Sequence, residues 1–106
     1  MLNNLVLVGR LAETPILEKS LNGTKVATII LAVTRSFKND MGEYDTDFIP
    51  ISLAGGIAES TCEYCRQNDI IGVKGRLAKL SYGELQVIAD KITLLRNNNN
   101  NQNKEE

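Results

Sequence analysis

The residues with the clearest chemical potential lie at the end of one long apolar segment. The stretch Asn22–Asp40 begins with an Asn-Gly turn, continues as the apolar run Val26–Val33 and ends in Arg35, Phe37 and Lys38. Cationic side chains can bind the phosphates of unpaired nucleic acid, and a flat aromatic ring can stack on its bases. This combination predicts a nucleic-acid surface, provided that the rest of the chain can position it.

Other kinds of chemistry find little support. The chain of 106 residues has no histidine, so the commonest general base and the commonest metal ligand are both absent. Cys62 and Cys65 form a C-x-x-C pair, but there is no second pair for a four-ligand zinc site and no βαβ pattern for a redox site. Asp45 and Asp47 lack a third ligand, so we expect solvated loop carboxylates. We therefore expect no cofactor, no metal and no enzymatic activity.

Composition restricts the compartment and the partners. Hydrophobic residues make up 42% of the chain, enough for one small core, and no apolar run approaches the roughly 18–20 residues of a membrane span. Two cysteines and the lack of a signal-peptide pattern predict a cytoplasmic protein. The net charge of −1 argues against strong overall attraction to nucleic acid, so binding would need a local basic surface.

The elements that must position these residues are mostly strands. Runs that are rich in β-branched residues or that alternate apolar and polar side chains are typical of strands. Such runs span Leu5–Leu11, Val26–Val33, Asp47–Ala54, Ile70–Lys79 and Leu85–Leu95. Gly9 predicts a bend in the first of them, and Ile16–Ser20 is a candidate for brief pairing. Asn22-Gly23 predicts a two-residue hairpin turn with positive φ angles.

One segment, Ile57–Gln67, predicts a helix, with Ala58, Cys62 and Cys65 along its apolar stripe. Three strands, one helix and two strands in this order predict an all-β fold, a five-stranded Greek-key OB-fold barrel with one short α-helix between strands three and four. We expect this domain to cover residues 1–96. The remaining residues, 97–106, are an Asn-rich polar segment that predicts a disordered tail.

Alternation predicts which side chains leave the core. The odd-numbered residues of Val26–Val33 are all apolar and are assigned to the inside. The same parity would turn Phe37 inward, so an outward Phe37 requires a β-bulge or the end of the strand nearby. In Asp47–Ala54, Phe48 and Pro50 fall on the outer face, and Pro50 predicts an edge or a bulge.

The last two strands can be assigned in the same way. In Ile70–Lys79, Lys74 and Arg76 face outward, while Leu77 is expected inside with two other apolar residues. Tyr82 occupies the tip of the following hairpin beside a glycine. The alternation of the last strand breaks near Asp90, which predicts a bulge at that position.

Taken together, the segments LVLVGRL, NGTKVATIILAVTRSFK, DFIPISL, AESTCEYC and IIGVKGRL resemble the bacterial and phage-type single-stranded DNA-binding proteins. The resemblance covers roughly Met1–Leu95, and the order and spacing of these pieces carry it. It implies an OB barrel that binds unpaired DNA without sequence preference and performs no chemistry. It also implies a homo-oligomer, usually a tetramer, with a dimer possible.

The resemblance assigns roles to individual residues. Rings that would stack on bases are Phe37, Phe48 and Tyr82, and each stacked base would contribute roughly 1–3 kcal/mol. Cations that match in kind or in strand placement are Arg10, Arg35, Lys38, Lys74, Arg76 and Lys79. Several positions depart from the family pattern: Ala54 replaces a stacking ring, and Asn4, Pro50 and Gly56 replace frequent cations. The chain also ends in Lys-Glu-Glu rather than in an acidic tip with a final aromatic residue.

We therefore expect a protein that coats and protects single-stranded DNA in replication, recombination and repair, in the cytoplasm at the nucleoid and away from membranes. Two alternatives remain open at this point. One is a primosome-type OB protein that binds both single-stranded DNA and a helicase or its loader. The other is an OB interaction module whose DNA surface has decayed, which the loss of a ring at Ala54 would suit. Replication and repair proteins are uncertain partners, because the acidic-aromatic tip is missing.

Overall fold

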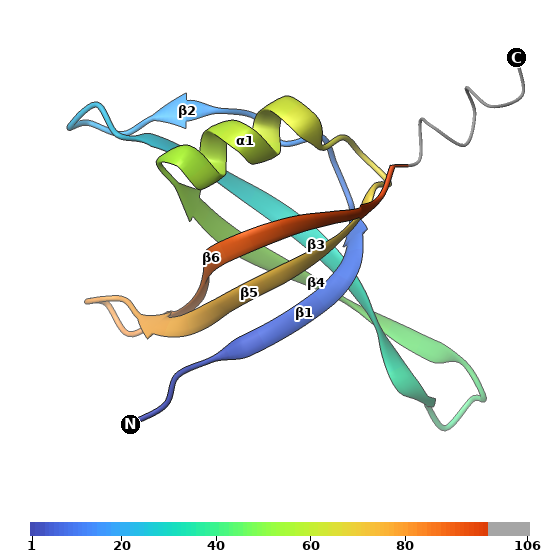
Figure 1. Cartoon of the computed structure of the whole chain (residues 1–106). Helices are drawn as coiled ribbons and strands as arrows, with labels where there is room; N and C mark the ends of the chain where they lie inside the picture. The colour runs from blue at the N-terminus through green and yellow to red at the C-terminus, as the bar shows by residue number, and fades with distance from the viewer. Residues whose placement is uncertain (98–106) are drawn as a thin grey trace, which may run out of the picture.

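The computed structural model describes residues 1–97, which form six strands and one helix (Figure 1). In chain order the elements are β1 (Leu5–Leu11), β2 (Glu18–Lys19), β3 (Lys25–Lys38), β4 (Tyr44–Ala54), α1 (Gly56–Tyr64), β5 (Ile70–Lys79) and β6 (Leu85–Arg96). The expected Asn-rich tail lies outside the described residues, apart from Asn97. No helix in residues 1–97 combines the length and the apolar character needed to span a membrane.

Five strands close into a barrel. Their order is β1-β5-β6-β4-β3, and a short β1–β3 pairing at Arg10↔Ala32 and Leu11↔Leu31 joins the two ends of the sheet. The β4–β6 pairing is parallel and the others are antiparallel. The predicted OB barrel is thus confirmed, with its helix between the third and fourth barrel strands. The two-residue strand β2 pairs with the start of β3, within the segment expected to pair briefly.

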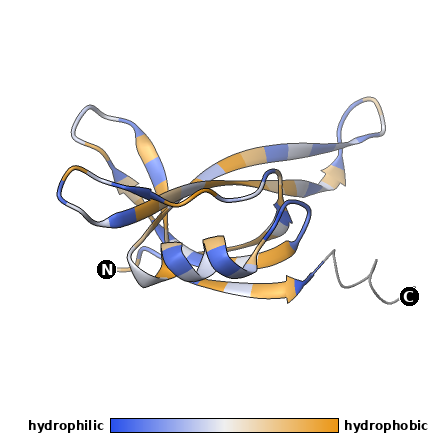
Figure 2. Ribbon diagram, turned by 90° about the horizontal axis from the view of Figure 1, so that it is seen from above, coloured by the Kyte–Doolittle hydropathy of each residue, from blue (hydrophilic) through white to orange (hydrophobic). Residues whose placement is uncertain are grey.

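The barrel interior follows the predicted alternation. The side chains of Leu11, Ile29, Leu31, Ile51 and Ile71 are fully buried, and each has an odd residue number. Figure 2 shows the resulting bands of high and low hydropathy along the strands. Helix α1 packs against β3, β4 and β6 and covers one end of the barrel. Its buried residues are Ala58 and Thr61.

Gly9 lies where β1 passes from β5 to β3, as its predicted bend requires. A Cβ at Gly9 would lie 2.4 Å from the backbone oxygen of Ala32. No side chain can be accommodated at that distance from a backbone oxygen, so the absence of a Cβ lets the two strands meet. Closure of the barrel therefore depends on a glycine at this position.

Three register shifts interrupt the longer strands, and one of them lies near the end of β6, between Ile70↔Arg96 and Ile71↔Leu94. Between Lys74↔Lys91 and Gly75↔Ala89, β6 has one additional residue, Asp90, so the predicted bulge is confirmed. In β3, the register changes between Thr34↔Thr46 and Lys38↔Tyr44, which places two additional residues in β3. This irregularity is the bulge that an outward-facing Phe37 requires.

The helix is shorter than expected, because it ends at Tyr64 rather than at Gln67. Cys65 is already extended, with φ −113° and ψ 144°. The guanidinium of Arg66 donates hydrogen bonds of 3.0–3.1 Å from Nη1 to the carbonyl oxygens of Cys62, Glu63 and Cys65. These carbonyls would otherwise lack intrahelical donors. An arginine two residues after Tyr64 thus favours the end of the helix at Tyr64.

The turn at Asn22-Gly23 differs from the expected two-residue form. In the first turn, the Gly23 N–H donates to the Ser20 carbonyl at 3.0 Å, and the Ser20 N–H donates to the Thr24 carbonyl at 2.8 Å. The loop therefore has three residues, and only Gly23 has a positive φ, of 88°. The same hydrogen bonds recur in the turns that end at Gly42 and Gly83. A three-residue loop with glycine in the left-handed position is a common hairpin connection.

Candidate nucleic-acid interface

The three predicted rings are all exposed to solvent. Phe37, Phe48 and Tyr82 have exposed fractions of 65%, 61% and 74%. None of them therefore belongs to the core, although apolar rings usually do. Phe48 faces outward from β4 because its position alternates with the buried Ile51 and Leu53.

Phe48 belongs to a row of residues that crosses three strands on the outer surface of the barrel. It pairs with Ala32 of β3, which in turn pairs with Arg10 of β1. Adjacent strands are about 4.8 Å apart, so Phe48 and Arg10 lie about two strand spacings from one another. Between them Ala32 has only a methyl side chain, and this residue is 6% exposed. The row thus combines a ring and a cation on one face.

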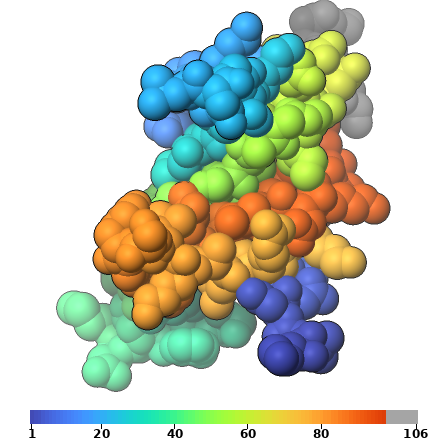
Figure 3. All heavy atoms as spheres, turned by 90° about the vertical axis from the view of Figure 1, so that its left-hand side faces the viewer, coloured from blue at the N-terminus to red at the C-terminus, as the bar shows by residue number. Residues whose placement is uncertain are grey.

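Two hairpins project beyond the barrel and carry the other two rings. The β3–β4 arm (residues 34–46) holds Phe37 in its bulge, and the β5–β6 arm (residues 76–88) holds Tyr82 in its turn. In Figure 1 they extend toward opposite sides of the view. Figure 3 looks onto the β5–β6 arm, with part of the β3–β4 arm visible below it. The rings are therefore spread over two arms and one barrel wall.

A groove of about 340 Å³ lies between β4 and the β5–β6 arm. Pro50, two residues after Phe48, lines one side of it, and Leu77 and Leu85 line the other. Leu77 was expected inside the barrel, but it is 45% exposed. The expectation is wrong because Leu77 lies on the arm, beyond the end of the core. The groove provides a continuous surface from the strand of Phe48 to the arm of Tyr82.

The predicted lysines are exposed and form no ion pair with any residue in the described part of the chain. Lys38 lies 5.9 Å from the centroid of the Tyr44 ring, at the limit for a cation–π interaction. Lys74 faces outward opposite Lys91 of β6, and Lys79 pairs with Leu85 near the arm's tip. Arg10 is also exposed and donates a 3.3 Å hydrogen bond to Asn68 Oδ1.

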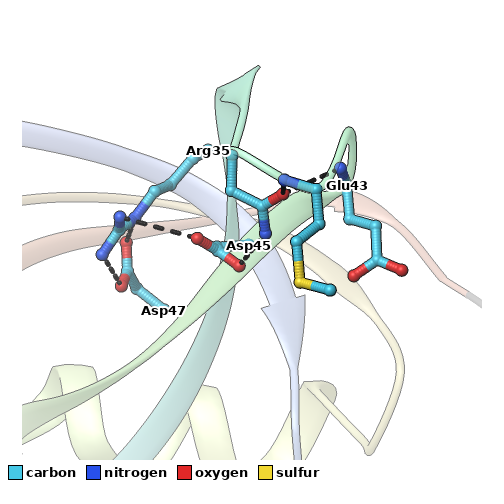
Figure 4. Close-up of polar contacts among 6 residues, drawn as sticks. Arg35, Glu43, Asp45 and Asp47 are labelled. Atoms are coloured by element: carbon cyan, nitrogen blue, oxygen red, sulfur yellow. Dashed lines mark hydrogen bonds and ion pairs between the residues drawn. The ribbon is translucent and has the colours of Figure 1, made fainter.

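The other two arginines among the predicted cations, Arg35 and Arg76, each form an ion pair with a carboxylate. Arg76 Nη1 lies 2.5 Å from Asp90 Oδ1, a contact that the bulge in β6 makes possible. Arg35 donates from Nε and from Nη2 to the two carboxylate oxygens of Asp47, both at 3.0 Å (Figure 4). Its hydrogen bond to Arg35 lowers the pKa of Asp47 and raises that of Arg35. The expectation of a merely solvated carboxylate is therefore wrong for Asp47.

This ion pair is the first part of a network that reaches the turn of the β3–β4 arm. Arg35 Nη1 also lies 3.9 Å from Asp45 Oδ2, and Asn39 donates to Asp45 Oδ1 at 3.1 Å. The side-chain oxygen of Asn39 accepts hydrogen bonds from the backbone N–H groups of Met41 and Glu43, at 2.9 and 3.0 Å. Figure 4 shows these contacts from strand to turn.

Tyr44 is a candidate that the sequence analysis missed. It is 54% exposed, and it lies four residues before Phe48 on the same strand. Residues four apart in a strand share a face. The available signal was the alternation of Tyr44, Thr46 and Phe48. It was hidden because the residues around Gly42 predict a loop, whereas β4 begins at Tyr44.

The C-x-x-C cysteines lie away from these residues, at the end of α1. Both are free thiols; Cys65 is buried and Cys62 is half-buried. Burial raises the pKa of both thiols, so little reactive thiolate forms near neutral pH. Both also pack against the core cluster, in agreement with the expected packing role.

Comparison with known proteins gives consistent matches. The sequence pattern of the family described as "Single-strand binding protein family" matches residues 2–95. "Single-stranded DNA-binding protein 2" of Staphylococcus aureus (strain COL) is 39% identical over 109 aligned positions, which cover 95% of this chain and 78% of that protein. "Single-stranded DNA-binding protein B" of Bacillus subtilis (strain 168) is 43% identical over 82 positions, which cover 77% of this chain and 73% of that protein.

One solved structure shows the same architecture. The crystal structure of the wild-type single-stranded DNA binding protein from Thermus aquaticus matches with a TM-score of 0.78 at 24% sequence identity. The match covers 92% of this chain and 52% of the other, so this chain spans about half the length of that protein. At this identity the likeness supports the fold alone.

Proposed function

This chain belongs to the single-strand binding protein family, and we propose that it binds unpaired DNA without sequence preference and without altering it chemically. The observation that carries the proposal is the exposure of Phe37, Phe48 and Tyr82 among cations. Exposed rings are available for stacking, and every base offers a ring face, so stacking tolerates any sequence. We further propose that the protein protects single strands in the cytoplasm, at the nucleoid, during replication, recombination and repair.

The proposed path of the DNA joins the three rings. It runs from Phe37 along the outer face of β4 past Phe48, follows the groove beside Pro50 and ends at Tyr82. Lys38 and Arg10 flank its first half, and the cations of β5 flank its second half: Lys74, Arg76 and Lys79. A hydrogen bond of 3.2 Å from the Tyr82 hydroxyl to Glu84 raises the pKa of this phenol and fixes its outer edge.

Salt dependence and strand preference test this proposal. We expect dye-labelled oligo-dT to bind more tightly than duplex DNA of equal length, with affinity falling as salt rises. On single strands, the log–log slope is about −0.7 for each neutralised phosphate, so four free cations predict about −3 per protomer. Fluorescence anisotropy at several salt concentrations measures both quantities. Equal binding to both DNAs, or a dissociation constant weaker than about 10⁻⁴ M at low salt, would favour the interaction-module alternative.

We also propose that copies of this chain assemble through β1. Within residues 1–97, residues 5–9 of β1 pair only with β5, which leaves the other edge of this part of the strand without a partner there. Val6 and Val8 face outward there, with exposed fractions of 68% and 54%. An unpaired edge beside exposed apolar side chains favours pairing with another chain, and an antiparallel edge contact fits two-fold symmetry.

A charged substitution on β1 tests the assembly. Val8→Lys is expected to shift the protein toward monomers in sedimentation velocity, because a lysine would have to be desolvated in the interface. Ile16→Lys is the control, because Ile16 is 70% exposed but lies between β1 and β2, away from this edge. The sedimenting mass of the wild type separates a tetramer from the dimer that the primosome-type alternative predicts. If both variants sediment like the wild type, assembly does not use this edge.

A further inference from the structure

The six predicted cations differ in how strongly they are already neutralised. The lysines have no carboxylate partner in the described part of the chain, whereas Arg35 has two. Both carboxylates come from the strand that carries Phe48, so they lie beside the proposed DNA path. Asp45, Asp47 and Arg35 together carry a net charge of −1. Two carboxylates would therefore repel a DNA phosphate that approaches the Arg35 guanidinium to form an ion pair.

The geometry of the Arg35–Asp47 ion pair places Asp47 in direct competition with a DNA phosphate. Asp47 occupies Nε and Nη2 of Arg35 in a bidentate arrangement. A phosphate uses the same planar fork, with two oxygens accepting from two guanidinium nitrogens. The Nε–Nη2 edge cannot serve both acceptors at once, and on the other edge Asp45 Oδ2 lies 3.9 Å from Nη1. The side chains of Arg35 and Asp47 are each 45% exposed. Water and salt therefore screen their attraction, and an incoming phosphate can displace the carboxylate.

We propose that Asp47, supported by Asp45, competes with DNA phosphate for Arg35 and thereby limits the affinity of this protein for single strands. The inference rests on the proposed function and identifies two carboxylates as determinants of its affinity. A phosphate can pair with Arg35 only when the Arg35–Asp47 contact opens, and the released carboxylate then becomes a repulsive neighbour, so in the wild type Arg35 remains largely paired with Asp47. Part of the electrostatic gain from Arg35 is lost in this exchange.

The same contacts could instead serve only to hold the β3–β4 arm in shape. The network from Arg35 through Asp45 to Asn39 links the strands to the backbone of the turn. In that case, breaking it would misplace Phe37 and weaken binding. The two roles therefore predict changes of opposite sign, and one substitution at Asp47 can separate them.

The experiment compares Asp47→Asn with Asp40→Asn by anisotropy of labelled oligo-dT over a range of salt. Each variant removes one negative charge from the hairpin formed by β3 and β4, but Asp40 forms no ion pair within residues 1–97. We expect Asp47→Asn to bind about two- to fivefold more tightly than Asp40→Asn at low salt, the range typical of exposed ion pairs. Its log–log salt slope should also be steeper by about 0.7, because one more phosphate is neutralised.

A second pair of variants assigns the effect to Arg35. In an Arg35→Gln background, Asp47→Asn should no longer tighten binding beyond Asp40→Asn, because the contested cation is gone. Equal affinities and slopes for Asp47→Asn and Asp40→Asn in the native background would overturn the inference, and so would weaker binding by Asp47→Asn. Either result leaves the proposed function intact as long as the wild type prefers oligo-dT to duplex DNA. A wild type without that preference would refute both.

Discussion

Replacing Phe48 with alanine is expected to weaken the binding of unpaired DNA by about 1–3 kcal/mol, or roughly 5- to 150-fold. This range is the one known for stacked bases in single-strand-binding OB proteins as a class, to which this chain belongs. Phe48 is the ring on the barrel wall itself, in the same row as Arg10. Because its ring is 61% exposed, its loss leaves the core unchanged, and the free energy of unfolding should stay nearly the same. Anisotropy titration with labelled oligo-dT measures the binding change.

Tyr64→Ala provides a matched control for this substitution. Tyr64 is 63% exposed, so it resembles Phe48 in accessibility, but it lies at the end of α1, away from the proposed DNA path. Its replacement should change the affinity for oligo-dT by less than about twofold. If Phe48→Ala and Tyr64→Ala bind oligo-dT equally well, the ring on β4 does not stack on bases, and the proposed path is wrong.

Gly75→Ala is expected to destabilise the barrel. A Cβ at this position would lie 2.2 Å from the backbone oxygen of Ile88 and 3.1 Å from its carbonyl carbon. Backbone atoms of a paired strand cannot rotate away as a side chain can. Forcing additional atoms into a packed site costs typically about 1–3 kcal/mol, and sometimes more. Urea denaturation at a fixed protein concentration, so that any assembly contributes equally, measures the loss.

Gly56→Ala serves as the comparison. Gly56 begins α1, and apart from its chain neighbours and the backbone of its own helix, a Cβ there would have no heavy atom of residues 1–97 within 4 Å. Alanine at a compatible backbone position reduces the entropy of the unfolded chain, so this variant should be as stable as the wild type or slightly more stable. Equal denaturation midpoints for the two variants would show that β5 and β6 can separate at Gly75 without cost.

Most of the strand pattern could be predicted because alternation is a local property. The bounds of β1 and β5 were predicted correctly, since each is a regular run that ends at a change of composition. The bulge at Asp90 was predictable for the same reason, because a carboxylate interrupts the apolar alternation. The exposure of Phe48 followed from its parity alone.

The ion pair between Arg35 and Asp47 could not be predicted in this way. Both residues were identified, but they are 12 positions apart, and their contact depends on the register between β3 and β4. The two additional residues in β3 also shift the pairing beyond Thr34, and no sequence pattern gives their number. Leu77 shows another limit of prediction from alternation. Its position in the alternating pattern placed it inside the barrel, but alternation does not tell where along a strand the core ends.

The three-residue turn that the hairpins share restricts how the length of a hairpin can change in evolution. Each of the three hairpins closes through a loop of the same three-residue form. The length of a hairpin therefore depends only on how many residue pairs precede its turn. Adding one residue to each strand extends a hairpin by about 3.4 Å and moves its tip residue to the opposite face. Adding two residues to each strand restores the face and extends the hairpin by about 7 Å. The reach of the arm that carries Tyr82 should therefore grow in discrete steps of this size, not continuously.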